Sequence, residues 1–449
     1  IPSIVDYRKA KKVLMQTTRR EQITVIVCMY IGYLMLMFCR TAFTTVSPAL
    51  VEDPDLSLTT THIGDILGYA ALGSLVGKLL TGFVADHFGG RLTLLVALGV
   101  VASLTAAMGY SASFSAFVLF IFCLQLLRAG GWPALTKLIG QWVPPESYGR
   151  TWGILSTASR TGVVISSLAL GLLLVYALGE VDPDTLVAEN PGGWRWVPIA
   201  AGSLGLLVVL GLWWRFPKRP ASARPKADEP KPLDLLATLR FFARADRFWL
   251  ICASLMCITM LMALVNFTGL YLAQSFEVSA GKAATAATVF PFGCLIAVLL
   301  VGLIYDRLTR KQRIYFVGAS LVVGCLCIAG LIWITEAPYD LTLRFNVALA
   351  LILLLGACIA PAYYLPMSVF SVEFGGARSG VLVGFIDATG YAAEAVFMPY
   401  AGRLADQSGG WTHFMWLLLV IACVGLVSTA MFLYRDHRAH QGPGNTLAL

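Results

Sequence analysis

The chain has 449 residues; 58% of them are hydrophobic, only 13% are charged, and the formal net charge is +8. Soluble domains carry about 25% charged residues, so this composition excludes a soluble globular protein and indicates one whose solvent is lipid. The apolar runs are continuous rather than alternating, which favours spanning helices of about 20 residues over a β-barrel. The positive charge follows from the basic cytoplasmic segments of membrane proteins, and we expect no nucleic-acid partner.

Apolar windows predict twelve membrane-spanning helices. The opening residues are basic and precede an apolar run longer than the core of a signal peptide, so we expect a spanning helix there. The predicted helices lie at 22–48, 64–86, 92–110, 114–141, 150–178, 196–216, 247–274, 282–304, 314–335, 344–370, 378–402 and 411–435.

Two polar segments indicate the domain organisation. Residues 179–194 are acidic and contain no Lys or Arg, whereas residues 215–247 hold nine Lys or Arg and five Pro. A proline-rich, charged stretch does not build a packed core, so the second segment reads as a flexible linker. We predict an N-terminal six-helix bundle at 1–214, a basic cytoplasmic linker at 215–246 and a second six-helix bundle at 247–449.

The connecting segments alternate in charge. Lys and Arg concentrate at the start of the chain, in the linker, at 307–313 and at 435–438, and acidic residues concentrate in the segments between. Cytoplasmic loops carry an excess of Lys and Arg. The sequence therefore predicts a multi-pass plasma-membrane protein with both termini in the cytoplasm.

A short motif recurs after the second helix of each half and predicts an internal repeat. It reads Gly-x-x-x-Asp followed by basic residues, and the two copies begin 220 residues apart. Glycine allows close helix approach, and the charged residues cap or anchor the helix ends. We interpret it as a conformational motif. Its positions are Gly82, Asp86 and Arg91 in the first half, and Gly302, Asp306 and Arg307 in the second.

The motifs and the helix count together resemble the major facilitator superfamily over nearly the whole chain. Within it, the chain resembles the organophosphate:phosphate antiporter branch, which includes bacterial glycerol-3-phosphate and hexose-phosphate transporters. The resemblance implies an all-α membrane protein of two pseudo-symmetric six-helix bundles in a bacterial inner membrane, and we expect a monomer. It is carried by Gly32-Tyr33, Arg40, Ser47 to Glu52, Lys78 to Gly82, Gly131-Trp132-Pro133, Gly384-Phe385, Gly390-Tyr391, Asp406 and Gly409 to Trp411.

Four of the basic residues inside predicted helices of the first half are candidates for the site. A charge at the bilayer centre costs about 2.5–3.5 kcal/mol, so it faces a wet cavity or a partner. Arg40 lies near the midplane and matches a family arginine that binds substrate phosphate; the alternative is an internal salt bridge. Lys78 is similar to a family cavity lysine, with snorkelling as its alternative. Arg160 and Arg128 are further candidates for substrate binding, and Arg128 is equally compatible with a structural ion pair.

The second half departs from the family pattern. The antiporters place a second phosphate-binding arginine in helix 7, but residues 260–266 here contain no basic residue. Helix 11 instead carries Asp387 and Glu394, seven residues and about two turns apart on one side of the helix. We expect one to bind a coupling proton or a substrate cation. The alternative is a charge lock to one of the arginines.

Other candidates are less specific. Asn266, Tyr363 and Tyr391 are predicted to shape the substrate pocket, although aromatic residues in helices more often pack than bind. Pro361 and Pro366 are expected to break helix 10 and form a gate. None of the ten Cys forms a C-x-x-C pair, and neither H-E-x-x-H nor a nucleotide-binding P-loop is present. We expect no metal, no cofactor and no enzymatic activity.

These features predict a secondary active transporter. We expect it to move a small organic anion or zwitterion by alternating access between the two bundles, coupled to protons. Basic charge in the first half and acidic charge in helix 11 argue against plain sugar-phosphate exchange. The alternatives are a proton-driven drug or metabolite exporter, an organophosphate:phosphate exchanger and, third, a transporter-like receptor that senses a solute.

Overall fold

The computed structural model describes residues 19–144, 147–180, 188–217, 240–304, 307–375, 379–407 and 409–439, and these are almost entirely helical. The first half, residues 19–217, contains α2 (Arg19–Glu52), α3 (Thr60–Phe88), α4 (Gly90–Met108), α5 (Phe114–Arg128), α6 (Gly131–Trp142), α7 (Tyr148–Leu178), the 3₁₀ helix η2 (Pro191–Arg195) and α8 (Trp196–Arg215). The second half, residues 240–439, contains α10 (Asp246–Met262), α11 (Leu264–Phe276), α12 (Ala280–Ala286), α13 (Val289–Ile304), α14 (Arg310–Glu336), α15 (Leu341–Gly375), α16 (Ser379–Ala405) and α17 (Gly410–Ala439).

These helices form twelve crossings, since α5 continues into α6, α10 into α11 and α12 into α13. Eleven of the crossings are long and apolar enough to span a membrane by composition. The twelfth is α16, which has 27 residues but carries Asp387, Glu394 and Arg403. These charged residues reduce the apolar character of α16. The predicted all-α membrane fold is confirmed.

The prediction of a break in helix 10 is wrong. The α15 helix runs without interruption from Leu341 to Gly375, through both Pro361 and Pro366. The helices of the described chain are interrupted elsewhere, at residues 129–130, at Ala263 and at residues 287–288. A transmembrane helix tolerates proline where neighbouring groups satisfy the freed carbonyl. Proline alone therefore does not locate a break.

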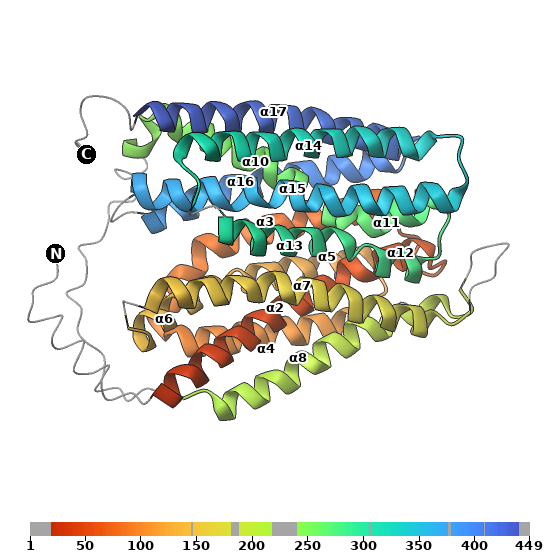
Figure 1. Cartoon of the computed structure of the whole chain (residues 1–449). Helices are drawn as coiled ribbons and strands as arrows, with labels where there is room; N and C mark the ends of the chain where they lie inside the picture. Colours follow the sequence, from red (N-terminus) through yellow and green to blue (C-terminus); the bar gives the residue numbers. More distant parts are fainter. Residues whose placement is uncertain are drawn as a thin grey trace, which may run out of the picture.

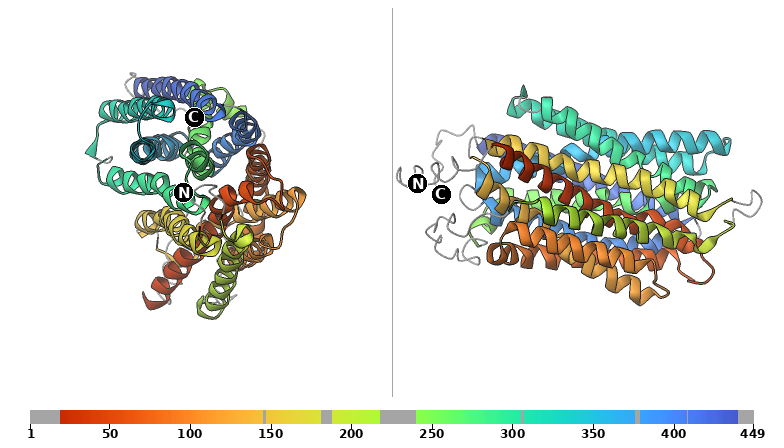
Figure 2. Two further views of the ribbon diagram at one scale, coloured as in Figure 1. Left: turned by 90° about the vertical axis from the view of Figure 1, so that its right-hand side faces the viewer. Right: turned by 90° about the horizontal axis from the view of Figure 1, so that it is seen from below.

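The helices run side by side in an elongated bundle (Figure 1). The first turn of α2 and the last turn of α17 lie at one end, which we call the terminal end; the other is the distal end. Viewed along its length, the bundle has the helices of the first half on one side and those of the second half on the other (Figure 2). The predicted linker at 215–246 lies largely outside the described residues.

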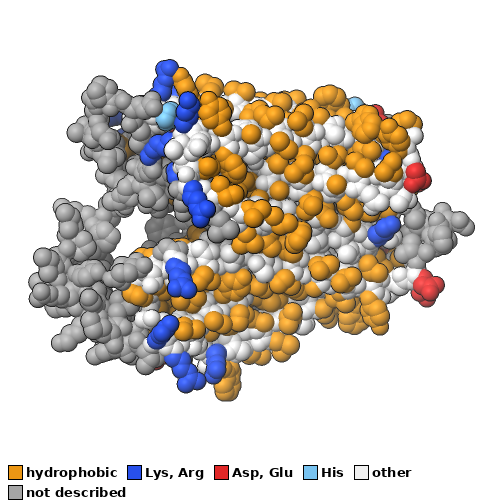
Figure 3. All heavy atoms as spheres, viewed as in Figure 1, with side chains coloured by type: hydrophobic (Ala, Val, Ile, Leu, Met, Phe, Trp, Pro, Cys, Tyr) orange, Lys and Arg blue, Asp and Glu red, His pale blue; other side chains and the backbone are white. Residues whose placement is uncertain are grey.

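Charge and apolar surface are distributed as a membrane requires. On the face shown in Figure 3, Lys and Arg gather at the terminal end, Asp and Glu appear at the distal end, and a broad apolar surface lies between them. Large apolar side chains on the outside of the bundle are more than half exposed, among them Leu207, Leu326 and Val420. Lipid, not protein, is the medium that such side chains suit.

The two halves pack most closely near the distal end, where α3 meets α16. A Cβ atom added to Gly64 would lie 2.7 Å from the Cα of Gly402, so the two backbones are in contact. Pro399 packs in the same way against Gly68, one turn further along α3. Small residues let helix backbones approach closely within a membrane. This seam holds α16 against the first half beside the site described below.

In the first copy of the repeated motif, the basic residue joins two helices of its own half. Arg91 donates hydrogen bonds to the carbonyl oxygens of Trp213 (3.0 Å) and Phe216 (3.2 Å) at the end of α8. Arg307 is exposed. The packing of Gly82, Asp86 and Gly302 is not described, and Asp306 lies outside the described residues.

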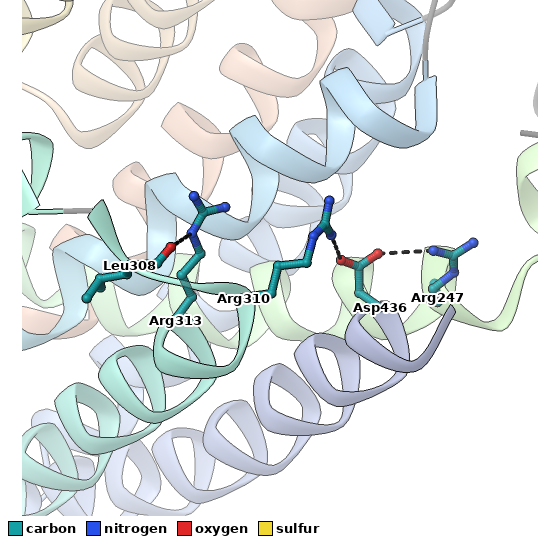
Figure 4. A network of polar contacts seen from close by, with 5 residues as sticks. All are labelled: Arg247, Leu308, Arg310, Arg313 and Asp436. Carbon is teal, nitrogen blue, oxygen red and sulfur yellow. Dashed lines mark hydrogen bonds and ion pairs between the residues drawn. The ribbon is translucent and has the colours of Figure 1, made fainter. Parts of the chain in front are cut away.

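An equivalent connection in the second half centres on Asp436 at the end of α17 (Figure 4). Its carboxylate is 3.0 Å from Arg247 of α10 and 3.3 Å from Arg310 at the start of α14. Arg313 donates to the carbonyl oxygen of Leu308 at 3.1 Å. In both halves a basic residue near the motif ties the third helix of that half to the sixth.

Candidate functional site

A cavity lies between the two halves, near the middle of the bundle. The space open to the centre of a water molecule is about 60 Å³, room for about four to six water-sized groups. Helices α2, α3, α5 and α7 line it from the first half, and α11, α12 and α16 from the second. Its polar lining residues are Arg40, Thr41, Thr44, Thr45, Ser74, Gln125, Ser167, Asn266, Tyr391 and Glu394.

Arg40 and Glu394 bring opposite charges to this one cavity. Arg40 lies on α2, twelve residues or about 18 Å from its distal end, and Glu394 lies near the middle of α16, only 8% exposed. The two side chains attract each other electrostatically. Within the described part of the chain, neither has a hydrogen bond or an ion pair. Both charges are therefore available to a solute.

Asn266 and Tyr391 also line the cavity, as predicted for pocket-shaping residues. Asn266 is buried near the start of α11, just after the helical break at Ala263. Tyr391 lies one turn before Glu394 on α16, so the two share one side of that helix. The break aims a polar residue at the cavity from a helix that is otherwise apolar.

Lys78 and Asp387 form an ion pair across the two halves, from α3 to α16. The Lys78 ammonium also lies 5.0 Å from the centroid of the Tyr391 ring. Lys78 follows the lining residue Ser74 by one turn on α3, toward the terminal end, so the pair lies at the terminal side of the cavity. Neither residue lines it. The alternative reading of Asp387, a charge lock, named an arginine as its partner; the partner is the lysine.

Arg160 makes a second contact across the halves. Its guanidinium carbon is 4.6 Å from the centroid of the Tyr364 ring on α15, an arrangement that favours a cation–π interaction. Tyr363, predicted to shape the pocket, packs edge-on against Tyr364 at 4.8 Å and does not line the cavity. Arg160 precedes the lining residue Val163 by one turn, so this contact also lies at the terminal side.

Arg128 lies behind the cavity wall. It is only 7% exposed, and it bonds to Gln125 and, at 3.3 Å, to the hydroxyl of Ser74. Gln125 and Ser74 themselves line the cavity, but Arg128 does not. Its described contacts are hydrogen bonds to neutral side chains, not the ion pair named as its alternative: it orients two lining residues and adds positive potential to the site.

Sequence reasoning missed the hydroxyl groups of the cavity. Thr41, Thr44 and Thr45 stand within two turns of Arg40, and each hydroxyl donates to a carbonyl of its own helix at 2.9–3.0 Å. Bonding of this kind satisfies a buried hydroxyl, and its oxygen can still accept a bond from a solute. Three threonines beside an arginine in an apolar helix were the available signal.

A polar seal at the distal end was also missed. Gln274 of α11 donates to Thr60 of α3 at 3.1 Å and accepts from the indole of Trp411 at 2.8 Å. Beside it, Arg403 pairs with Asp65 at 3.1 Å, and Thr61 donates to Asp406 at 2.7 Å. We call these seven residues the distal seal. It joins the halves on the side of the cavity opposite to Lys78 and Arg160.

Comparison with known families gives a match to the Major Facilitator Superfamily over residues 29–392. Among known proteins, the chain is similar to the "Membrane sensor protein UhpC" of Escherichia coli (strain K12), at 23% identity over 323 residues, 67% of this chain and 70% of that protein. It is also similar to a "Probable hexose phosphate transport protein" of Chlamydia trachomatis, at 21% identity over 435 residues, 89% and 88% of the two chains. The predicted resemblance is confirmed.

Solved structures show the same fold. A bacterial homolog to the human lysosomal transporter Spinster, in an inward-facing and unoccupied conformation, aligns with a TM-score of 0.74 at 16% identity, covering 95% of this chain and 100% of that one. A D-xylose-proton symporter aligns with a TM-score of 0.68 at 16% identity, covering 92% and 97%.

Proposed function

Since the chain belongs to the major facilitator superfamily, a family of secondary transporters, we propose that it carries a small organic anion or zwitterion by alternating access. One observation supports this cargo above the others: Arg40 faces the central cavity without a partner among the described residues. Arginine offers a planar fork of donors that suits carboxylate or phosphate. An unpaired guanidinium inside the membrane-spanning region is costly unless an anion binds to it.

The two sides of the cavity suit alternating access. On the distal side the halves are joined by packed glycines and the distal seal. On the terminal side the described cation contacts are those of Lys78 with Asp387 and Tyr391, and of Arg160 with Tyr364. We propose that a solute enters and leaves past these side-chain contacts in this conformation. Opening of the distal seal would then expose the cavity to the other side of the membrane.

Orientation, location and coupling belong to the same proposal. Lys and Arg gather at the terminal end, so this end faces the cytoplasm by the positive-inside rule. The protein then lies in a bacterial inner membrane as a monomer, with a proton as its coupling ion and no cofactor. Asp387 and Glu394 are the carboxylates that a coupling proton would use.

Two transport alternatives remain open to test. Helix 7 lacks a second arginine, so organophosphate exchange has less support. A proton-driven exporter of drugs or metabolites would have a larger and more apolar pocket than the polar lining seen here. Efflux of apolar compounds from whole cells, independent of Arg40, would favour the exporter.

A receptor is the candidate of a different class. One relative is named a membrane sensor protein, and the same fold would serve to detect a solute and signal it. Solute binding without flux in reconstituted vesicles, together with a dedicated protein partner, would favour this reading over transport.

The decisive experiment is uptake into proteoliposomes from a panel of small carboxylates, phosphates and amino acids. Arg40→Ala should reduce uptake of the true substrate by about tenfold to a hundredfold, because a hydrogen bond to a charged group is worth about 1.5–3 kcal/mol. Arg244→Ala, which removes an exposed arginine at the terminal end, is the matched control and should transport normally. Unchanged uptake by Arg40→Ala would refute the proposed site.

A further inference from the structure

Asp387, Tyr391 and Glu394 form a stripe along the side of α16 that faces the first half. Positions four and seven residues apart lie on one side of an α-helix. Asp387 and Tyr391 both contact Lys78 of α3, and Tyr391 and Glu394 both line the cavity. The stripe thus presents two carboxylates to the first half, with an aromatic ring between them.

The two carboxylates differ in what neutralises them. Asp387 is paired with Lys78, whose ammonium also lies over the Tyr391 ring. Glu394 is buried and, across the described ranges of the chain, accepts no hydrogen bond and joins no ion pair. Removing a carboxylate from water is costly unless a donor or cation compensates it. Among the described residues, an ion pair compensates the first carboxylate, whereas no cation is in direct contact with the second.

Arg40 is the complementary group across the cavity. It attracts Glu394, but no ion pair joins these two described residues. A plain anion bound at Arg40 would leave the Glu394 charge uncompensated in a site of low dielectric. A molecule with one negative and one positive group neutralises both residues at once, and the loaded site then carries no net charge from this pair.

We infer that Glu394 binds the cationic group of a small zwitterionic substrate whose carboxylate is bound by Arg40. The inference rests on the proposed function and narrows its cargo to short amino acids and compounds of that chemistry. The space in the cavity that is open to the centre of a water molecule is small, about 60 Å³, which favours a short molecule. Neutral polar side chains, among them Thr44, Gln125 and Asn266, are positioned to bind what lies between the two charged groups.

Matched pairs of probes test this assignment. Glycine is paired with propanoate, β-alanine with butanoate, and γ-aminobutyrate with pentanoate, so that an ammonium replaces a methyl group of similar size. Binding to the purified full-length protein at neutral pH is measured by calorimetry. At least one amino acid should bind about tenfold or more tightly than its partner. Equal affinities within every pair, or no binding by any of the three amino acids, would overturn the inference.

Glu394→Gln keeps the side-chain shape and removes its charge. We expect this variant to bind the preferred amino acid about tenfold or more weakly, while its affinity for the paired alkanoate stays unchanged. Glu277→Gln, at an exposed glutamate between α11 and α12, is the control and should alter neither affinity. Thermal unfolding of both variants confirms that they fold.

Two results with the Glu394→Gln variant would contradict the inference. If the preference for the amino acid survives, its ammonium is bound elsewhere. If the variant binds an alkanoate tightly at neutral pH, and the unmodified protein does so only in acid, Glu394 carries a proton instead. In either case a strong effect of Arg40→Ala on alkanoate uptake would leave the proposed function standing. Loss of that effect would remove the proposed function as well.

Discussion

The four basic candidate residues in the helices of the first half each have a different environment. Arg128 is bonded by neutral side chains of its own half, Lys78 by a carboxylate of the second half, and Arg160 lies over an aromatic ring. Arg40 faces the cavity without a partner in the described chain. The same formal charge therefore orients neighbouring side chains at Arg128, forms an ion pair between the halves at Lys78 and contacts an aromatic ring at Arg160. At Arg40 it is the proposed binding group.

The Lys78–Asp387 pair should contribute to stability in a way that a double-mutant cycle reveals. Lys78→Met or Asp387→Leu alone leaves one partly buried charge unpaired, and we expect each to lower the free energy of unfolding by about 1–3 kcal/mol. The double variant should recover most of that loss, because apolar partners replace both charges. Thermal unfolding in detergent measures the cycle; additive losses would show that the two residues do not interact.

Arg128 should matter for folding more than for solute affinity. Arg128→Met leaves the Gln125 amide and the Ser74 hydroxyl without their donor, and we expect the unfolding temperature to fall, with a loss of about 1–3 kcal/mol. The Kd for the substrate should change far less than in Arg40→Ala. A large loss of affinity with unchanged stability would instead place Arg128 in the binding site.

At the scale of the helix, α16 combines two incompatible demands. Its charged stripe belongs to the site, and its small residues build the seam with α3 near the distal end. These charges explain why α16 is not recognisable as a membrane span by composition, whereas the other eleven crossings are. Close backbone packing in the seam offsets the cost of these charges. This packing depends on the absence of side chains at Gly64 and Gly402.

Two glycines of α16 allow a matched test of the seam. A Cβ atom at Gly402 would meet the backbone of α3 at 2.7 Å, whereas one at Gly384 has nothing within 4 Å. Gly402→Ala should destabilise the protein by about 1–3 kcal/mol through overpacking. Gly384→Ala should be neutral or stabilising by up to about 1 kcal/mol, because alanine favours helix. Similar unfolding temperatures for the two variants would argue against a tight seam.

At the scale of the whole molecule, the distal seal and packed glycines join the halves on the distal side of the cavity, and the described contacts of Lys78 and Arg160 join them on the terminal side. The distal seal spans Thr60 to Asp65 of α3 and Arg403 to Trp411 around the α16–α17 connection. A transporter that exposes one site to two sides must release one set of contacts while it forms the other. The conformation described is thus closed on the distal side.

A reversible cross-link should hold the molecule in this conformation. Thr61 and Asp406 are in hydrogen-bond contact across the halves, so Thr61→Cys/Asp406→Cys is suited to a short bifunctional thiol reagent. We expect cross-linking to stop uptake into proteoliposomes and a reducing agent to restore it when the linker contains a disulfide. Substrate binding should persist. The Thr61→Cys single variant, treated in the same way, controls for the native cysteines; equal inhibition in both would refute the expectation.

Much of the fold was predictable from sequence because it depends on local properties. Each predicted helix overlaps an observed crossing, since an apolar run of sufficient length has no other stable form in lipid. Pro361 and Pro366 misled the prediction because neighbours in the bundle decide whether a proline breaks a helix. The candidates Arg40, Asn266, Tyr391 and Glu394 were found by asking which polar residues an apolar helix would not carry without a reason.

The sequence by itself determined the medium, the number of crossings, the family and the polar residues that need an explanation, because composition and helix length are properties of each segment alone. Only the tertiary structure decided which of those residues meet. It placed Lys78 against Asp387, moved Arg128 behind the cavity wall, and left Arg40 and Glu394 facing one small space. The physical reason is that pairing depends on the rotation and depth of helices hundreds of residues apart, which their packing fixes and no single segment encodes.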